Sequence, residues 1–271
     1  MAKAFLFNHD RCSGCRNCQI VCKDEHCGYA WLPYAEAQPD IGQFWIKINE
    51  KERGQVPVVS VSYVATLCNH CADAPCAAAC DKGAFVRRAD GLLVLEPENC
   101  DGCGDCLEAC PLGAIFLNEE LSIAQKCTGC AHLLDDGWSV PRCVEACSTE
   151  ALLFGEEEEL DLSGAVVLDE VQGLGSKVYY RNLPKRFVAG CVYDPDINEV
   201  LVGAQVSLLD SAGNVVASQE TDAFGDWKFD QIEPAEYTVS ITANEYPTTT
   251  LKVDVSTEDR FTGDLALKKQ A

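Results

Sequence analysis

The chain has 271 residues, of which 47% are hydrophobic and 24% charged, a composition typical of a globular protein of one large or two ordinary domains. Its formal net charge of −22 argues against nucleic-acid binding, which requires a basic surface. The chain holds 18 cysteines, and every one except Cys191 lies at or before Cys147, so a cysteine-rich part precedes a conventional part.

The first 154 residues contain short β-like stretches between groups of cysteines. These stretches are 4–7, 44–48, 58–63 and 92–95. Pieces of this length bury little apolar surface, so they need another source of cohesion. We therefore expect residues 1–154 to form a domain organised by its cysteines.

Sixteen of the cysteines form four quartets. The quartets are Cys12, Cys15, Cys18 and Cys22; Cys68, Cys71, Cys76 and Cys80; Cys100, Cys103, Cys106 and Cys110; and Cys127, Cys130, Cys143 and Cys147. The first and third have the C-x2-C-x2-C-x3-C spacing of bacterial ferredoxins, and Pro111 completes that pattern in the third. Such a loop presents three thiolates to one cubane, and the short helix after it turns the fourth cysteine toward a neighbouring cluster. The pattern predicts four [4Fe–4S] clusters.

Two other uses of cysteine fit this pattern less well. A disulfide framework is typical of small secreted chains, and the amino terminus has no signal-peptide features. Zinc accepts two C-x2-C pairs, but three cysteines within seven residues, found twice, suit a cubane better.

The remaining candidate ligands are expected to have packing roles. Cys27 and Cys191 lie outside the quartets, and buried free thiols are common. The histidines all lie near quartets: His9, His26, His70 and His132. For His26 or His70, a hydrogen bond to a cluster is the alternative to packing. No nucleotide-binding or nucleophile motif is present, so the sequence predicts no catalytic residue.

The pattern changes after residue 154. Residues 155–186 combine an acidic run at 156–159 with an extended stretch at 179–185, which predicts a solvated linker and then a segment packed over the first region. Over 187–271, short stretches of alternating apolar and polar residues are separated by turn residues. About seven such strands suit an antiparallel β-sandwich. The expected fold class is α+β.

The order of the quartets, with four residues inside the second and twelve inside the fourth, resembles the iron–sulfur subunits of the dimethyl-sulfoxide-reductase superfamily of molybdenum and tungsten enzymes. The resemblance covers residues 1–154 and implies a duplicated bacterial ferredoxin, in which the first and fourth quartets exchange their last cysteines, as do the second and third. The implied ligand sets are Cys12, Cys15, Cys18 and Cys147; Cys127, Cys130, Cys143 and Cys22; Cys68, Cys71, Cys76 and Cys110; and Cys100, Cys103, Cys106 and Cys80.

Within that superfamily, segments 22–26, 124–128 and 131–136 resemble the small subunit of pyrogallol–phloroglucinol transhydroxylase, as does the carboxy-terminal sandwich. Segment 221–229 also resembles the immunoglobulin-like B-type repeat of collagen-binding proteins, although Ala235 stands where such repeats have glycine. The transhydroxylase subunit has an incomplete cysteine set, whereas all four quartets are intact here. Transhydroxylation transfers no net electrons, so a complete set favours net reduction, as in the related catechol dehydroxylases.

The resemblance implies a non-catalytic electron-transfer subunit. Its partner would be a large catalytic subunit that holds molybdenum or tungsten on bis-molybdopterin guanine dinucleotide, lies nearest the Cys12 cluster and acts on phenolic or catecholic substrates. A further electron donor is a second expected partner.

Two alternatives stay open. One is the same subunit serving an oxyanion or sulfoxide reductase, and the other is a free polyferredoxin with a docking domain, which would elute near its mass of 29.4 kDa. The sequence has no membrane-spanning run and no targeting signal, so we expect a cytoplasmic location, or export together with a partner that carries a twin-arginine signal.

Overall fold

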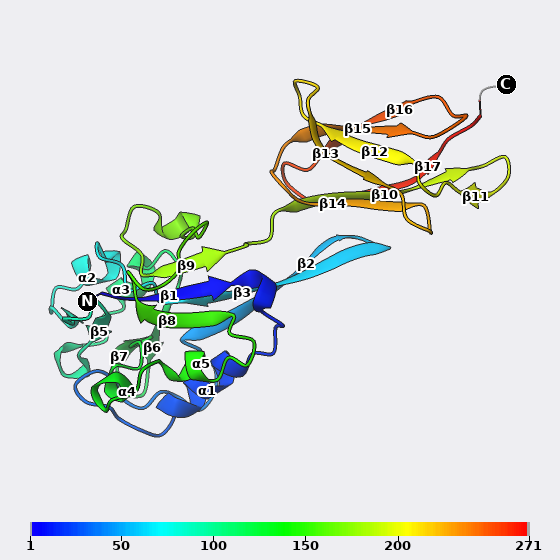
Figure 1. Cartoon of the computed structure of the whole chain (residues 1–271). Helices are drawn as coiled ribbons and strands as arrows, with labels where there is room; N and C mark the ends of the chain where they lie inside the picture. The colour runs from blue at the N-terminus through cyan, green and yellow to red at the C-terminus, as the bar shows by residue number, and fades with distance from the viewer. Residues whose placement is uncertain (1, 270–271) are drawn as a thin grey trace. The chain divides into compact units, whose positions relative to one another are not determined.

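The computed structural model describes residues 2–269. The chain folds into two units. The first unit comprises the residues up to Glu50 together with Tyr63–Leu183, and the second comprises Lys51–Ser62 together with the residues from Pro184 onward. Figure 1 labels the elements of both units.

A three-stranded sheet forms the centre of the first unit. Its strands, in order, are β8 (Leu152–Glu156), β1 (Lys3–Asn8) and β9 (Val178–Arg181). β1 pairs antiparallel with β8 and parallel with β9. The apolar run 4–7 is buried at every position because β1 is covered on both faces. Phe5 and Phe7 of β1 and Tyr180 of β9 are almost completely buried.

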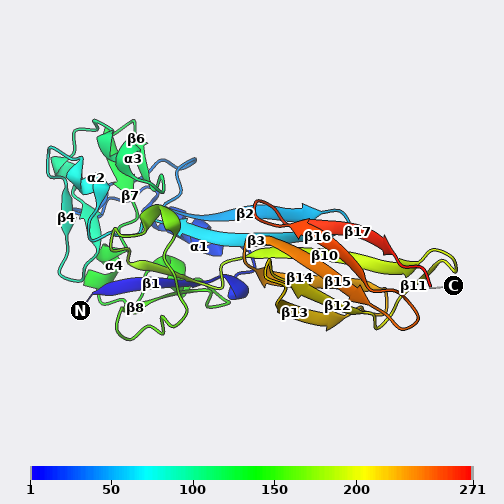
Figure 2. The same ribbon diagram turned by 90° about the horizontal axis from the view of Figure 1, so that it is seen from above.

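Short helices and two small hairpins surround the cysteines of the first unit. The helices are α1 (Asn17–His26), α2 (Pro75–Ala78), α3 (Asp105–Ala109), α4 (Ala131–Asp135) and α5 (Arg142–Glu145), with 3-10 turns at η1 (His9–Arg11), η2 (Pro97–Asn99) and η3 (Asp169–Val171). The hairpins pair β4 (Phe85–Arg87) with β5 (Leu93–Leu95), and β6 (Ile115–Asn118) with β7 (Ile123–Lys126). α1 packs against α5 (Figure 1), and α2 packs against α3 (Figures 1 and 2). Helices that are distant in sequence are therefore neighbours in the fold.

The acidic stretch that follows β8 belongs to the first unit. The carboxylate of Glu156 pairs with Lys3 at 2.8 Å, and that of Glu157 pairs with Lys177 at 2.6 Å. Residues 155–183 are thus attached to the first unit through β9 and these ion pairs, although the sequence suggests a solvated linker for part of them.

The second unit is a β-sandwich of two sheets (Figure 1). One sheet has the order β11-β10-β14, with β17 on the other side of β10, and the other sheet has the order β13-β12-β15-β16. The strands are β10 (Arg186–Asp194), β11 (Glu199–Val200), β12 (Gln205–Leu209), β13 (Val215–Glu220), β14 (Asp226–Ile232), β15 (Glu236–Thr242), β16 (Thr249–Asp254) and β17 (Arg260–Ala266). The apolar members of the alternating stretches, such as Val206, Trp227 and Val239, form the core between the sheets.

One strand pair departs from the expected antiparallel arrangement. β10 and β17 are parallel, with Val188 opposite Arg260 and Tyr193 opposite Ala266. The chain crosses from β16 in one sheet to β17 in the other, and β17 then runs in the same direction as β10. The pairs of β10 with β14, β12 with β15 and β15 with β16 are antiparallel.

The second unit also includes the end of a hairpin formed by β2 (Ile46–Gln55) and β3 (Val58–Leu67). The Arg53 guanidinium donates to the carbonyl oxygen of Lys185 and lies 3.7 Å from the carboxylate of Asp259. A side chain at Gly54 would collide with the buried ring of Phe187. Residues 51–62, which lie inside the expected domain 1–154, therefore group with the sandwich.

Candidate iron–sulfur cluster sites

Cysteines from the first and the last quartet line one cavity. Cys12 and Cys15 lie in the loop before α1, Cys18 lies in the first turn of α1, and Cys147 follows α5. Apolar side chains such as Phe7 complete the wall of the cavity. The quartet loop passes directly over the ring of Tyr63, where a Cβ on Gly14 would lie 2.6 Å from ring carbon Cδ1.

Two further cavities combine cysteines of the second and third quartets. One is lined by Cys68, Cys71, Cys76 and Cys110. The other is lined by Cys80, Cys100, Cys103 and Cys106. The second quartet extends through α2 and the third through α3. Because α2 and α3 pack against each other, the last cysteine of each quartet lies at the other quartet's cavity.

The remaining quartet cysteines are buried as a group: Cys22, Cys127, Cys130 and Cys143. Burial raises the pKa of the Cys22 thiol well above its usual value, and the neighbouring thiols of Cys130 and Cys127 raise it further. The pKa of Cys143 is raised first by burial and then by Cys130 and Cys22. The packing of α1 against α5 explains why Cys22 and Cys143 are neighbours.

The thiols that line the cavities are also difficult to ionise. Burial raises the pKa of Cys18 to about 12, with contributions from Cys147 and Cys12, and raises that of Cys76 to about 12, with a contribution from Cys68. Iron binds the thiolate, so these groups are suited to ligation only when bound cations stabilise the charged sulfurs. Four soft donors around a largely apolar cavity fit an iron–sulfur cluster in which each iron takes its own thiolate.

Backbone amides are directed at several of these sulfurs. Gly129 N–H donates to Cys127 Sγ at 3.3 Å, Ala124 N–H to Cys100 Sγ at 3.3 Å, and Ala114 N–H to Cys110 Sγ at 3.4 Å. Such hydrogen bonds stabilise negative charge on the sulfur and are one determinant of a cluster's reduction potential. Within residues 2–269, no three His, Cys, Asp or Glu side chains converge on a position for a single metal ion.

The four cysteine groups follow one another as a row. Cys18 of the first cavity is an electrostatic neighbour of Cys22, and Cys127 is one of Cys68. The second and third cavities adjoin, because their cysteines pack together in one apolar cluster. The groups at the two ends each contain an exposed cysteine, Cys15 and Cys103. A row with an exposed cysteine at each end can carry electrons through the unit.

Cys27 and Cys191 lie outside these groups. The Cys27 thiol is 3.7 Å from the carbonyl oxygen of Pro39, and the Cys191 thiol is 3.5 Å from that of Phe224. Each thiol thus has a backbone acceptor away from the cavities.

Two of the histidines are completely enclosed. His26 and His70 are 1% and 0% exposed, and burial lowers the pKa of His26 to about 4 and that of His70 well below its usual value. Nδ1 of His26 lies 3.0 Å from the carbonyl oxygen of Cys22, and Nδ1 of His70 accepts from Leu93 N–H at 3.1 Å. His132 pairs with Glu25 at 3.1 Å, and His9 lies near Asp10 at the surface.

Sequence reasoning overlooked one residue near the cysteine groups. Lys126 is 2% exposed, and its Nζ donates to the carbonyl oxygens of Leu93 and Cys127. The available signal was its position, at the end of the buried stretch 123–126 and directly before a ligand candidate.

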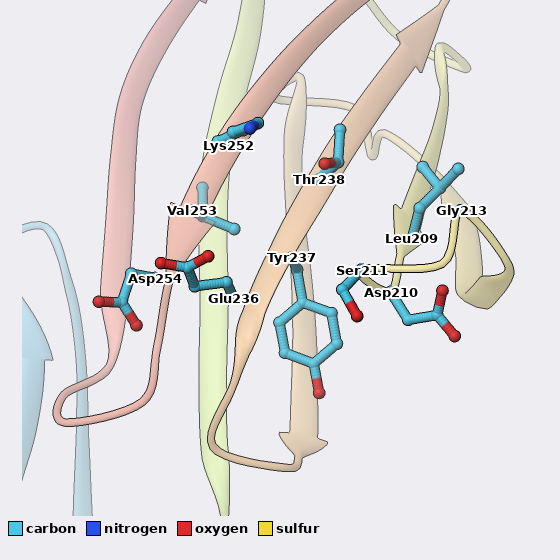
Figure 3. A pocket seen from close by; sticks show the side chains of 10 residues that line it. All are labelled: Leu209, Asp210, Ser211, Gly213, Glu236, Tyr237, Thr238, Lys252, Val253 and Asp254. Atoms are coloured by element: carbon cyan, nitrogen blue, oxygen red, sulfur yellow. The ribbon is translucent and has the colours of Figure 1, made fainter.

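The second unit has an open pocket of a different character (Figure 3). Its wall includes Asp210, Glu236, Lys252 and Asp254, and it has no cysteine. The carboxylate of Asp210 already accepts hydrogen bonds from the backbone N–H groups of Ala212 and Asn214. This pocket is unrelated to the cysteine groups.

No helix within residues 2–269 has the length and apolar character needed to span a membrane.

Comparison with known proteins agrees with these two kinds of structure. A family model of the 4Fe-4S dicluster domain matches residues 59–157, and one of the carboxypeptidase regulatory-like domain matches residues 188–268. The small subunit of pyrogallol hydroxytransferase from Pelobacter acidigallici is 40% identical over 86% of this chain and 88% of its own length.

Other relatives match a smaller share of the chain. A subunit of tetrathionate reductase from Salmonella typhimurium is 31% identical, over 68% of this chain and 74% of that protein. A component of anaerobic dimethyl sulfoxide reductase from Escherichia coli is 35% identical, over 58% of this chain and 74% of that protein. The chain belongs to the family of iron–sulfur electron-transfer subunits of the dimethyl-sulfoxide-reductase superfamily of molybdenum and tungsten enzymes.

Proposed function

We propose that the chain carries four [4Fe–4S] clusters and relays electrons to a large molybdopterin subunit that reduces phenolic or catecholic substrates. The observation that carries this proposal is that three cavities are each lined by four cysteines drawn from two separate quartets. The fourth cluster is assigned to the buried group of Cys22, Cys127, Cys130 and Cys143.

The clusters supply one-electron transfer when bound. The chain's own residues supply the ligands, bury the group of Cys22, Cys127, Cys130 and Cys143, and leave the outer groups accessible at Cys15 and Cys103. We assign the Cys12 group to the partner's active site, and the Cys100 group to an external electron donor.

The partner and substrate class rest on the relative that matches both units of this chain. The pyrogallol hydroxytransferase small subunit aligns over 86% of the chain, whereas the dimethyl sulfoxide reductase component aligns over 58%. Its name specifies a phenolic substrate and a multisubunit enzyme. We extend both to this protein, together with a bis-molybdopterin guanine dinucleotide holding molybdenum or tungsten in the large subunit.

Net reduction is the direction we propose. Sixteen cysteines are available for four complete ligand sets, and a complete relay is useful only if electrons enter or leave the complex. A transhydroxylation moves a hydroxyl group without net electron transfer, so it does not require a complete electron relay. The subunit itself is non-catalytic in this proposal, and it acts in the cytoplasm or is exported together with its partner.

A second candidate function follows from the match to the tetrathionate reductase subunit. The same relay would then serve a partner that reduces a sulfur oxyanion or a sulfoxide. Assays of the purified complex with catechol, tetrathionate and dimethyl sulfoxide, each with a reduced dye, distinguish the two candidates by which acceptor is consumed.

Replacing Cys100 by Ala in the complex tests the relay. We expect dye-driven reduction of the substrate to fall at least tenfold, because a terminal cluster loses a ligand, while the molybdenum or tungsten content of the large subunit stays constant. The Cys27→Ala variant is the matched control, since Cys27 lies outside every group. Full reductive turnover by the Cys100 variant would refute the relay.

A further inference from the structure

The side chain of Lys126 is buried inside the first unit. It ends β7, a strand whose four residues are all buried, and it is 2% exposed. Lysine is almost never buried to this extent without a charged partner, because removing an ammonium group from water is costly.

The hydrogen-bond partners of this ammonium group are backbone carbonyl dipoles, not carboxylates. Nζ donates to the carbonyl oxygens of Leu93 and Cys127, the latter at 2.9 Å. Within residues 2–269, no carboxylate lies at ion-pair distance from it. Two carbonyl groups compensate only part of a full charge, so the balancing negative charge has to come from another source.

The position of Lys126 indicates that source. Its acceptor Leu93 lines the cavity of Cys68, Cys71, Cys76 and Cys110, and its acceptor Cys127 belongs to the group with Cys22, Cys130 and Cys143. The ammonium group therefore lies between the two inner cysteine groups.

We infer that Lys126 is the built-in counter-charge of the two inner clusters and raises their reduction potentials; this rests on the proposed four-cluster function. A cubane with four thiolate ligands is anionic and becomes more so on reduction, and net charge near a cluster is one determinant of its potential. A fixed cation in a region that water does not screen stabilises the reduced form most. Lys126 is thus a positioning and tuning residue that transfers no electron itself.

Two neutral variants of the full holo-subunit test this assignment. Lys126→Met keeps the approximate shape of the side chain, and Lys126→Gln keeps donors for the carbonyl groups. Redox titration followed by electron paramagnetic resonance should show lower midpoint potentials for two of the four clusters and unchanged potentials for the other two. Lys177→Met is the control with the same change in net charge, since the Lys177 charge is partly exposed and already paired with Glu157 at 2.6 Å.

Unchanged inner potentials in a fully loaded neutral variant would overturn the inference. If both neutral variants lose iron, Lys126→Arg decides the matter: retention of all clusters by this variant assigns the requirement to the charge, and their loss reduces Lys126 to a packing role. Failure of the proposed function looks different, because the unmodified subunit would then contain fewer than four clusters.

Discussion

At the scale of single residues, the last cysteine of each quartet lies among cysteines of another quartet. Cys147 lines the cavity of Cys12, Cys15 and Cys18, although it lies 129 positions after Cys18. A thiol in that position connects the end of the cysteine-rich region to its beginning.

Replacing Cys147 by Ala tests this exchange. We expect the cluster of the first cavity to lose an iron or to be lost, since one of its four thiolates is missing, while the cluster of the Cys127 group stays intact. Iron analysis and electron paramagnetic resonance of the anaerobic protein measure both effects, with Cys27→Ala as the control. Loss of the Cys127 cluster with an intact Cys12 cluster would show that each quartet keeps its own last cysteine.

The sequence predicts the cysteine groups better than it predicts their surroundings. Spacing limits which thiols of one quartet can reach one cubane, so the quartets follow from short-range geometry. Which quartet supplies the fourth thiol of another is implied by the resemblance to the superfamily, because that pairing joins cysteines that are distant in sequence. The burial of Lys126 depends on how the β4–β5 and β6–β7 hairpins pack, which is a tertiary property. Nothing in the lysine itself separates it from the exposed lysines of the chain.

At the scale of elements, the β2–β3 hairpin is divided between the two units. Its end meets the sandwich through Arg53, whose side chain is 9% exposed, and Asp259, whose side chain is 2% exposed. Asp259 also accepts a hydrogen bond from Phe187 N–H at 2.9 Å. The hairpin end thus satisfies buried polar groups of the second unit.

We predict that Arg53→Ala destabilises the second unit by about 3 kcal/mol, because it leaves a buried carboxylate without its cation. Hydrogen exchange of the amides in β10 and β17 should accelerate roughly 100-fold, at tenfold per 1.4 kcal/mol. Glu52→Ala is the control, because Glu52 is an exposed neighbour whose replacement should leave hydrogen exchange unchanged. Equal exchange in both variants would mean that the hairpin contributes nothing to the sandwich.

Local patterns predict strands but not their partners. Alternation at 237–241 and 251–255 corresponds to strands β15 and β16 because one face of each is buried. The parallel pairing of β17 with β10, and the contact of 51–62 with the sandwich, join segments that are distant in sequence. Such pairings depend on the topology, and the polar stretch 49–55 carries no sign of a buried contact.

At the scale of the whole molecule, the two units depend on different sources of stability. The apolar core of the sandwich contains no quartet cysteine. The core of the first unit includes Cys22, Cys68, Cys127 and Cys143, and its helices other than α1 are single turns. We therefore expect the first unit, but not the second, to depend on bound clusters for its cohesion.

Removal of iron should separate the two behaviours. The intact anaerobic protein should contain about 16 irons, four per cubane, and essentially no zinc.

After treatment with chelator and oxidant, we expect proteolysis throughout 63–183 and continued protection of 186–266, measured by mass spectrometry of the fragments. A protease-resistant first unit without iron would contradict this assignment of stability.

The exchange of last cysteines also has a consequence for how the protein is made. With the proposed ligand sets, the second and third cavities are complete once Cys110 has left the ribosome. Cys12, Cys15 and Cys18, the earliest thiols to emerge, then wait for Cys147, which at about 5–20 residues per second takes on the order of 10 s. The half of the relay that ends at the Cys100 group can therefore be loaded during synthesis, whereas the cluster assigned to the partner's active site can be completed only after the whole cysteine-rich region has been translated.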